Sequence, residues 1–561
     1  MRSSLLAASI VLALAGGSVL SACSGDIGKL PFETGGSGGT GGSPDPVDNP
    51  TFAPAPGGIR RLLARQYKNS IKMILGDAAA QAATPPEDVT LSEFETLAAA
   101  ELSAPPSAVE AYETSARAVS DAVIADTGTM AKIVPCVPLG ADDADCHRQV
   151  VERLGHQLWR RVLTEEEIAA IVAIAQDAAT EYGDFDQGVK YALMTLLESP
   201  YFLYTIEVGE VTADHPDFRT LTGPELATRL SLFLIDTTPD SKLLAQAENG
   251  NLATTDDVRA AAQDLLQRPE ARTALSSFYD VVFKLRDLPT TTKLPEAFPE
   301  WNTDLANAMR QESLLFFEDI IWNQNADYRD IFTANYTFVD SHLASLYGVD
   351  APASGFQKTT LPAEQMRSGF LGHAAYLSRY AHAGDTSPTR RGVFISNFLV
   401  CNEIPPPPPG VNTQFPPFDP QKPQTKKQYL EEIHHKASDN CSSCHALMDP
   451  FGYAMESYDG IGKFRTKDEN GLPIDPSGEI TDFGSFADAT ALGQLLHDDQ
   501  RTMNCIVQNL FRQSMGHKET KGERPAILAL QKAFADSGYK IQDALIEIVA
   551  SPAFAYVGEP K

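Results

Sequence analysis

Residues 441–452 read CSSCHALMDPFG, and the organisation of the chain is built around them. If the backbone is helical there, Cys441 and Cys444 lie one turn apart on one face, where both thiols can add to the vinyl groups of one haem. His445 follows directly and can offer an imidazole nitrogen to the iron. The spacing C-x-x-C-H is typical of c-type haem attachment, so the stretch predicts one covalent haem c.

Two other interpretations of the cysteine pair stay open. A zinc ion would take the two thiolates together with His434 or His435, because cysteine and histidine are its usual protein ligands. Alternatively, the cysteines form a reduced or disulfide-linked pair beside an unrelated histidine. We favour haem, because the N-terminus predicts an exported chain.

The ligand opposite His445 would decide whether such an iron transfers electrons or reacts with small molecules. His382 is the first candidate, since the chain around it has enough slack to fold over a haem. Met455 is the alternative, and Met515 and His517 are further options.

Two more residues bear on that site. His435 lies only six residues before Cys441, a short path around a ring roughly 10 Å wide, so we rank it low as a ligand. Arg465 is a possible contact for a haem propionate, because guanidinium groups pair well with carboxylates, and Lys463 could serve in its place.

Length and charge exclude some classes of function. The chain has 561 residues, enough for several domains, and its net charge is -29. A field of this sign repels phosphate backbones, so no nucleic-acid partner is expected. The redox partner is unknown, although a basic electron-transfer protein would suit an acidic surface.

The N-terminus predicts a lipoprotein. Residues 5–20 are apolar, but too short and too rich in small residues for a membrane span. They end in LSAC, which resembles a bacterial lipobox, so residues 1–22 form the expected signal peptide and Cys23 the lipidated first residue. An ordinary cleaved signal with an incidental cysteine is the alternative. No later stretch predicts a transmembrane helix.

The segment after the lipobox predicts a tether and a location. Residues 23–56 are rich in Gly, Ser, Thr and Pro and should be flexible. Ser24 resembles the sorting pattern for the outer membrane, so we expect the protein in the cell envelope, held by lipid. The membrane face is left open.

Cysteine usage fits export. Seven cysteines occur, and Cys23, Cys441 and Cys444 are already assigned. The remaining four suggest two disulfides, Cys136–Cys146 around an acidic loop and Cys401–Cys505 across the haem region.

The rest of the chain predicts a mostly α, multi-module fold with long loops. Apolar residues recur at three- and four-residue steps, Thr164 begins a helix with acids in its first turn, and no sustained strand alternation is visible. The modules are expected at 57–130, 145–208, 218–348, 365–466 (the haem region) and 483–561. Residues near 155–207 and 507–559 repeat at an offset of 352, with aromatic positions that we assign to packing.

The chain resembles the planctomycete-type cytochrome c proteins, a multi-module exported family common in planctomycetes and myxobacteria. The matching motifs lie at residues 60–67, 159–164, 199–207, 229–240, 336–348, 386–392, 441–452 and 458–465. Val162 departs from the pattern, where Pro is usual, as does the end of the motif at residues 515–517. The resemblance implies a cytochrome-like protein of uncharacterised domains, and it supplies no reaction.

Three functions therefore remain in view. The first is an electron-transfer module with one haem, and the second is an oxidative enzyme with an open iron position. The third is a scaffold or binding lipoprotein with a structural metal. The sequence contains no Ser-His-Asp ordering, phosphate loop or H-E-x-x-H motif that would suggest another enzyme class.

Overall fold

The computed structural model describes residues 51–406, 421–434 and 441–560. The described residues belong to one compact unit. The expected signal peptide, Cys23, His435 and most of the tether therefore lie outside the described residues. No helix of the described part combines the length and the apolar character needed to cross a membrane.

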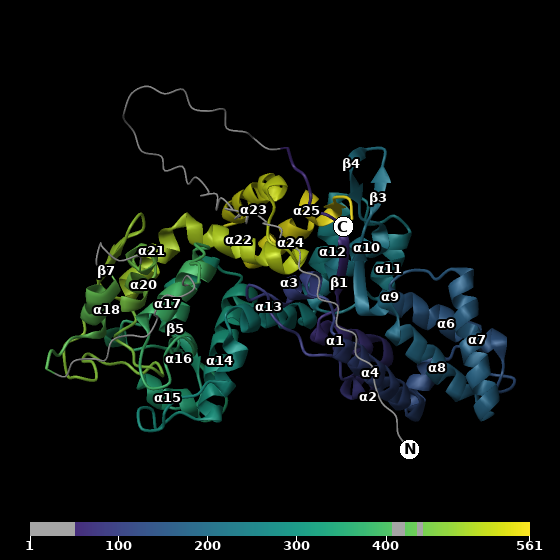
Figure 1. The fold of residues 1–561 in the computed structure, drawn as a ribbon, viewed down its shortest axis with the longest axis horizontal. Helices are drawn as coiled ribbons and strands as arrows, with labels where there is room; N and C mark the ends of the chain where they lie inside the picture. The colour runs from purple at the N-terminus through teal and green to yellow at the C-terminus, as the bar shows by residue number, and fades with distance from the viewer. Residues whose placement is uncertain (1–50, 407–420, 435–440, 561) are drawn as a thin grey trace, which may run out of the picture. The chain divides into compact units, whose positions relative to one another are not determined.

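Helices make up 59% of the structure, which confirms the mostly α fold (Figure 1). The N-terminal half contains β1 (Gly58–Arg61), α1 (Ala64–Leu75), α2 (Asp77–Ala82), α3 (Glu95–Glu101), α4 (Pro106–Ala125), α5 (Thr127–Ile133), α6 (Ala144–Trp159), α7 (Glu165–Tyr182), α8 (Phe185–Glu198), α9 (Pro200–Leu203), β2 (Tyr204–Glu207), β3 (Glu210–Thr212) and β4 (His215–Thr220). The middle contains α10 (Gly223–Ile235), α11 (Ser241–Glu248), α12 (Thr255–Leu266), α13 (Pro269–Val282), η1 (Leu285–Thr290), α14 (Thr303–Glu318), η2 (Asp319–Asn323), η3 (Tyr328–Phe332), β5 (Tyr336–Val339) and α15 (Ser341–Tyr347).

The C-terminal part begins after α15. It contains β6 (Gln357–Thr360), η4 (Ala363–Gln365), η5 (Gly369–Gly372), α16 (Ala374–Arg379), α17 (Pro388–Phe394), η6 (Ile395–Leu399), α18 (Lys426–His434), α19 (Ser442–His445), α20 (Asp449–Tyr453), β7 (Gly478–Ile480) and β8 (Gly484–Phe486). It ends with α21 (Ala489–Asp498), α22 (Gln500–Met515), η7 (Lys521–Glu523), α23 (Arg524–Asp536), α24 (Ile541–Val549), α25 (Pro552–Ala555) and β9 (Tyr556–Val557).

Helix starts follow the local sequence. Thr164 caps α7, where its side chain accepts the Glu167 backbone N–H while Glu167 bonds back to the Thr164 N–H. This reciprocal arrangement satisfies two amides that the first helical turn leaves unpaired. The cap that the sequence predicts at this position is therefore confirmed.

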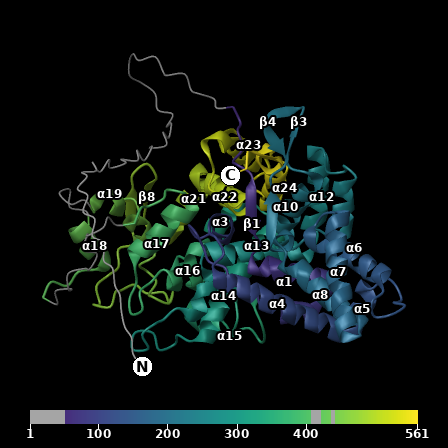
Figure 2. The ribbon, with the colours of Figure 1, turned by 45° about the vertical axis from the view of Figure 1, so that its right-hand side comes forward.

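Two hydrophobic cores hold the described residues together. The smaller core joins α1, α4, α6, α7 and α8, so the first two expected modules share one interior. The larger core runs from α10 through the C-terminal helices and also takes in Phe94 and Leu97 at the start of α3. Both views show the helices of the smaller core grouped on one side and α16–α18 on the other (Figures 1 and 2).

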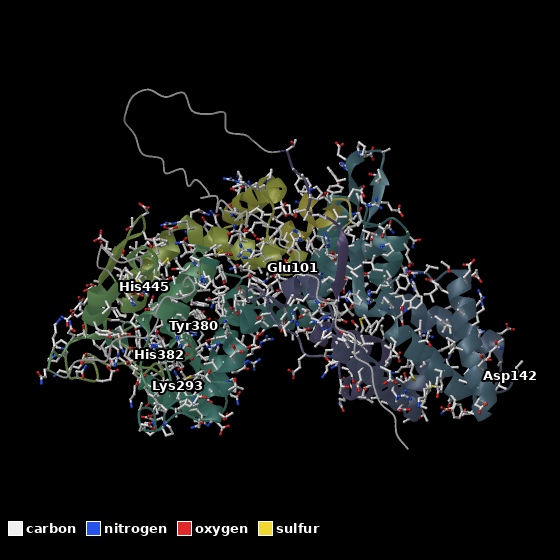
Figure 3. The ribbon with its side chains drawn as sticks, in the orientation of Figure 1. Glu101, Asp142, Lys293, Tyr380, His382 and His445 are labelled. Carbon is white, nitrogen blue, oxygen red and sulfur yellow. A yellow bond between two sulfur atoms is a disulfide. The ribbon has the colours of Figure 1, made fainter. Side chains whose placement is uncertain are left out.

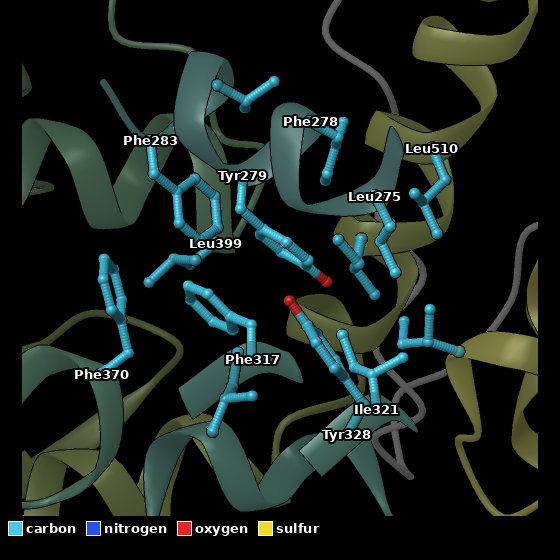
Figure 4. Packing of buried hydrophobic residues seen from close by; sticks show 14 of the residues in the cluster. Leu275, Phe278, Tyr279, Phe283, Phe317, Ile321, Tyr328, Phe370, Leu399 and Leu510 are labelled. Carbon is cyan, nitrogen blue, oxygen red and sulfur yellow. The ribbon is translucent and has the colours of Figure 1, made fainter. Parts of the chain in front are cut away.

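The region around residues 365–466 has no separate interior. Phe370 from η5 packs its ring 5.2 Å from Phe283 of the middle segment, and Phe283 packs against Phe394 of α17. Tyr279 stacks on Phe317 at 4.2 Å in the same cluster (Figure 4). Elements from two expected modules therefore bury one continuous apolar surface, and the segment around Cys441 depends on its neighbours for stability.

The repeat places two similar strands at the ends of two helical units. β2 pairs antiparallel with β1, and β9 pairs antiparallel with β4. Arg229 of α10 connects the copies, since its guanidinium donates to Glu207 Oε2 at 2.6 Å and to the Phe554 carbonyl at 2.8 Å. Phe202 and Phe554, one from each copy, are fully buried, which agrees with the packing role assigned to the repeated aromatics.

The end of the expected tether is part of the fold. The Ala53 N–H donates to the Gly522 carbonyl at 2.9 Å, and the Gly558 N–H donates to Ala55 at 2.7 Å. The tether boundary at residue 56 is therefore too late. Composition misled the prediction, because a Pro- and Gly-rich segment can still pair its backbone with a neighbouring chain end.

Glu312 of α14 is a fully buried carboxyl group, and no ion-pair partner for it is found in the part of the chain that the structure describes. Tyr347 and Thr337 donate to its Oε1 at 2.6 and 2.7 Å, and Thr337 also contacts His373 Nε2 at 3.3 Å. Burial raises the pKa of Glu312 from its ordinary value of 4.5 to about 8, although both hydroxyls oppose the rise.

The folded state should lose stability as the pH rises from the ordinary pKa of Glu312, 4.5, to its pKa in the folded chain, about 8. Unfolded Glu312 ionises above about pH 4.5 while the folded chain keeps the proton, so folding weakens by about 1.4 kcal/mol per pH unit until the folded pKa is reached. Urea unfolding at pH 5 and pH 8 should show that Glu312→Gln removes this slope. Glu318→Gln, a change of a partly exposed carboxylate on the same helix that pairs with Arg272, should keep it. A wild-type slope in Glu312→Gln would contradict the assignment.

Candidate haem site

The cysteine pair lies on a helical turn, as the motif requires. The His445 N–H donates to the Cys441 carbonyl at 3.1 Å, so α19 continues back to Cys441 and places Cys444 one turn along. Neither cysteine forms a disulfide, and both residues are half-buried. They are therefore available for covalent attachment from the same side of one short helix.

His445 is oriented by a carboxylate that the sequence analysis did not single out. Its Nδ1 lies 3.0 Å from Asp449 Oδ2, and Asp449 is fully buried at the start of α20. A neutral imidazole that donates through Nδ1 keeps the Nε2 lone pair available for a metal. Among the described residues, no hydrogen bond to Nε2 is found.

Two other side chains form hydrogen bonds with the Asp449 carboxylate. His434 Nδ1 lies 3.0 Å from the same Oδ2, and Thr389 Oγ1 donates to Oδ1 at 2.7 Å. The His434 and His445 rings are stacked with their centroids 3.5 Å apart. The spacing of four residues between His445 and Asp449 was a signal in the sequence, since it places both on one helical face.

Two glycines allow α17 and α20 to meet at backbone distance. A Cβ on Gly392 would lie 1.8 Å from the Met448 carbonyl oxygen, and one on Gly452 would lie 2.0 Å from that of Pro388. No side chain fits at such distances, so both positions require glycine. This contact brings Thr389 of α17 to Asp449 of α20.

Arg391 stabilises the same region through buried hydrogen bonds. Its side chain is fully buried, and its guanidinium donates to four carbonyl oxygens at 2.8–3.2 Å. These belong to Leu377, Met455, Tyr458 and Asp459. One side chain therefore fastens α16 and the segment after α20 to α17, and it satisfies backbone groups that would otherwise be buried unpaired.

A cavity of about 530 Å³ lies beside these elements. His382 and Thr389 are among its lining residues, and so are Lys426 and Leu430 of α18. His434 follows Leu430 by four residues, so it continues the same face of α18. α17 and α18 thus both line the cavity, and His434 lies at the end of α18 against Asp449 of α20.

Lys293 of the middle segment holds the backbone at the part of the cavity that His382 lines. Lys293, which is buried, donates from Nζ to the Ser378 carbonyl at 2.9 Å and to the His382 carbonyl at 3.1 Å. Burial lowers the pKa of Lys293 to about 7. Burial and the nearby Arg390 also lower the pKa of His382, which favours the neutral, ligating form. Figure 3 shows Lys293, His382 and His445 in the same region.

Other candidates lie elsewhere or are engaged. Met455 is fully buried in the larger core and does not line the cavity. Met515 is buried at the end of α22, and His517 bonds Glu523 at 2.9 Å. Lys463 pairs with Glu300 at 3.2 Å.

Arg465 is occupied as well. Its Nε donates to the Glu456 carbonyl at 3.1 Å, and it forms ion pairs with Glu456 and Glu469. These contacts use the guanidinium inside the protein, which argues against the propionate role suggested by the sequence.

The two disulfides are present as pairs. Cys136 bonds Cys146, and Cys401 bonds Cys505 of α22. The second one links the segment after η6 to the C-terminal helices, so it ties the haem region to its neighbour.

The residues present suit a covalent haem better than the alternative zinc site. Two cysteines that form no disulfide precede a histidine whose Nδ1 faces the Asp449 carboxylate. Thr389, which bonds the same carboxylate, lines a cavity whose other lining residues do not include Cys441, Cys444 or His445. By contrast, the cluster of possible metal ligands among the described residues is His434, His445 and Asp449, without either sulfur. The cysteines and His434 therefore do not converge as a zinc site would require.

Five family models match the chain in order. The descriptions are all "protein of unknown function": DUF1587 at residues 60–125, DUF1595 at 146–207, DUF1592 at 221–349, DUF1588 at 367–468 and DUF1585 at 484–554. Comparison with curated proteins and with solved structures finds no match. These modules are those of a cytochrome c-type group. The chain belongs to the planctomycete-type cytochrome c family.

Replacing Arg391 should unfold the region at lower denaturant. Arg391→Met leaves four carbonyls and Glu456 buried without this donor, so we expect a loss of about 3–5 kcal/mol. Urea unfolding measures it. Arg390→Met, at the exposed neighbouring position, should change stability by less than about 0.5 kcal/mol. Equal effects of the two changes would refute the role given to Arg391.

Proposed function

We propose that this protein is an exported cytochrome that carries one covalent haem c on Cys441 and Cys444, with His445 as the proximal ligand. The observation that supports it best is the contact between His445 Nδ1 and the buried Asp449 carboxylate at 3.0 Å. Such a partner fixes the ring orientation and raises ligand basicity. When bound, the haem supplies one-electron redox chemistry.

His382 is the proposed distal ligand. It lines the cavity beside α17 and α18, its backbone is held by Lys293, and its neutral form is favoured. A filled sixth position suits electron transfer, which is the function we favour. A basic partner protein would complement the acidic chain.

The cavity also supports a second candidate function. A space of about 530 Å³ beside the site could admit a small substrate, so an oxidative enzyme with an open iron position is the alternative. The sixth ligand separates the two proposals, because a filled position hinders substrate binding at the metal.

We also propose that Cys23 is lipidated and that the protein is anchored in the cell envelope, on the outer membrane. The lipobox-like LSAC sequence supports this proposal. Cys23→Ser should release the protein from membranes into the soluble fraction, as fractionation and immunoblotting would reveal. Continued membrane association of Cys23→Ser would contradict the lipid anchor.

Expression with haem-maturation machinery tests the haem proposal. The full chain should show c-type absorption bands and keep its porphyrin in acid acetone, whereas the double change Cys441→Ala/Cys444→Ala should lose both properties. The change Cys136→Ala/Cys146→Ala, which removes a distant pair, serves as the control and should keep the haem. A colourless product, or porphyrin that acid acetone extracts, refutes covalent attachment.

The same material tests His382. If His382 occupies the sixth position, the reduced protein should bind carbon monoxide poorly and His382→Ala should bind it readily. His342→Ala, which removes an exposed histidine that bonds Asp340, is the matched control. Strong carbon monoxide binding by the unaltered protein would instead favour the enzyme alternative.

A further inference from the structure

Three potential metal ligands meet at the start of α20. His434 Nδ1 and His445 Nδ1 each lie 3.0 Å from Asp449 Oδ2. One ligand atom from each of the three residues lies within 4.8 Å of those of the other two. His434 and Asp449 are buried, and His445 is half-buried. Two imidazoles and one carboxylate are the donor set of many divalent metal sites with open positions.

The distances suit coordination as well as hydrogen bonding. Two ligand atoms about 2.1 Å from a metal and at right angles to it are separated by about 3.0 Å, the separation from Asp449 Oδ2 to each ring nitrogen. Thr389 donates to the other carboxylate oxygen at 2.7 Å and so fixes its orientation, as outer-shell partners of metal ligands do. Thr389 also lines the cavity, where water could complete the coordination.

We propose that the haem-free chain binds one first-row divalent metal ion, such as Zn²⁺, through His434 Nδ1, His445 Nδ1 and Asp449. The cysteines take no part, since neither sulfur belongs to the cluster. This site differs from a zinc site built on Cys441 and Cys444.

The divalent ion and a haem iron would compete for His445, because each requires the ring proton on a different nitrogen. A neutral imidazole that binds a metal through Nδ1 carries its proton on Nε2, whereas one that donates from Nδ1 to Asp449 presents Nε2 as a ligand. The same ring cannot serve both while it is neutral. The metal would therefore occupy the chain before haem attachment and keep His445 from acting as the iron ligand.

Titration of the haem-free full chain with Co²⁺, followed by calorimetry and visible absorption, tests the proposal. One ion should bind per chain, without thiolate charge-transfer bands. His434→Ala and Asp449→Asn should each weaken binding by at least about 10-fold, and Thr389→Val by about 10-fold. Thr386→Val, which removes a similar hydroxyl contact to Glu456, should change it by less than about 2-fold.

The cysteine variant separates this site from the alternatives. Cys441→Ser/Cys444→Ser should bind Co²⁺ within about 2-fold of the unaltered chain, because the sulfurs lie outside the cluster. Loss of binding in that variant, no binding at all, or binding that Asp449→Asn and Thr389→Val leave unchanged would overturn the proposal. Thr389→Val keeps all three ligands. If a ligand variant fails to fold, the Co²⁺ affinity of Thr389→Val therefore tests the proposed site.

The test of metal binding is independent of whether haem attaches to the chain. Covalent haem is measured on chain made with maturation machinery, and Co²⁺ binding on chain made without it. Holoprotein with haem but no metal binding by the haem-free chain would refute the metal site alone. A metal-binding chain that never acquires haem would refute the cytochrome proposal alone.

Discussion

The contact between α17 and α20 is the constraint on which the candidate site depends. Gly392 and Gly452 let the two helices approach at backbone distance, and Arg391 then ties four carbonyls from the flanking segments to the same place. Burying a guanidinium is costly unless its donors are used, and here they satisfy buried backbone oxygens. The position of Asp449, and through it the orientation of His445, follows from this packing.

The candidate site also depends on packing in the larger core, which includes residues from more than one module. Rings from η5, α13, α14 and α17 pack together, and the Cys401–Cys505 disulfide joins the segment after η6 to α22. Lys293 reaches from the middle of the chain to the His382 wall of the cavity. The modules that are separate in sequence therefore act as one folding unit around the site, and a change in one can alter the geometry of another.

Local patterns were enough to predict part of this structure. Helical periodicity and caps such as Thr164 identify the fold class, because they depend on residues a few positions apart. The C-x-x-C-H spacing indicates the thiols and His445 for the same reason. The interactions of Arg391 could not be predicted, since its partners lie up to 68 residues away. Asp449 was within reach of the motif, but its contact with His434 depends on how α18 packs.

The most direct test of the account is the intact mass of the full chain purified from cells that make and attach haem c. We expect added mass equal to one haem per chain, retained under denaturing conditions, because two thioether bonds at Cys441 and Cys444 would hold it. A polypeptide without added mass, or one that loses the porphyrin on denaturation, would contradict the claim that residues 441–452 form a covalent haem site.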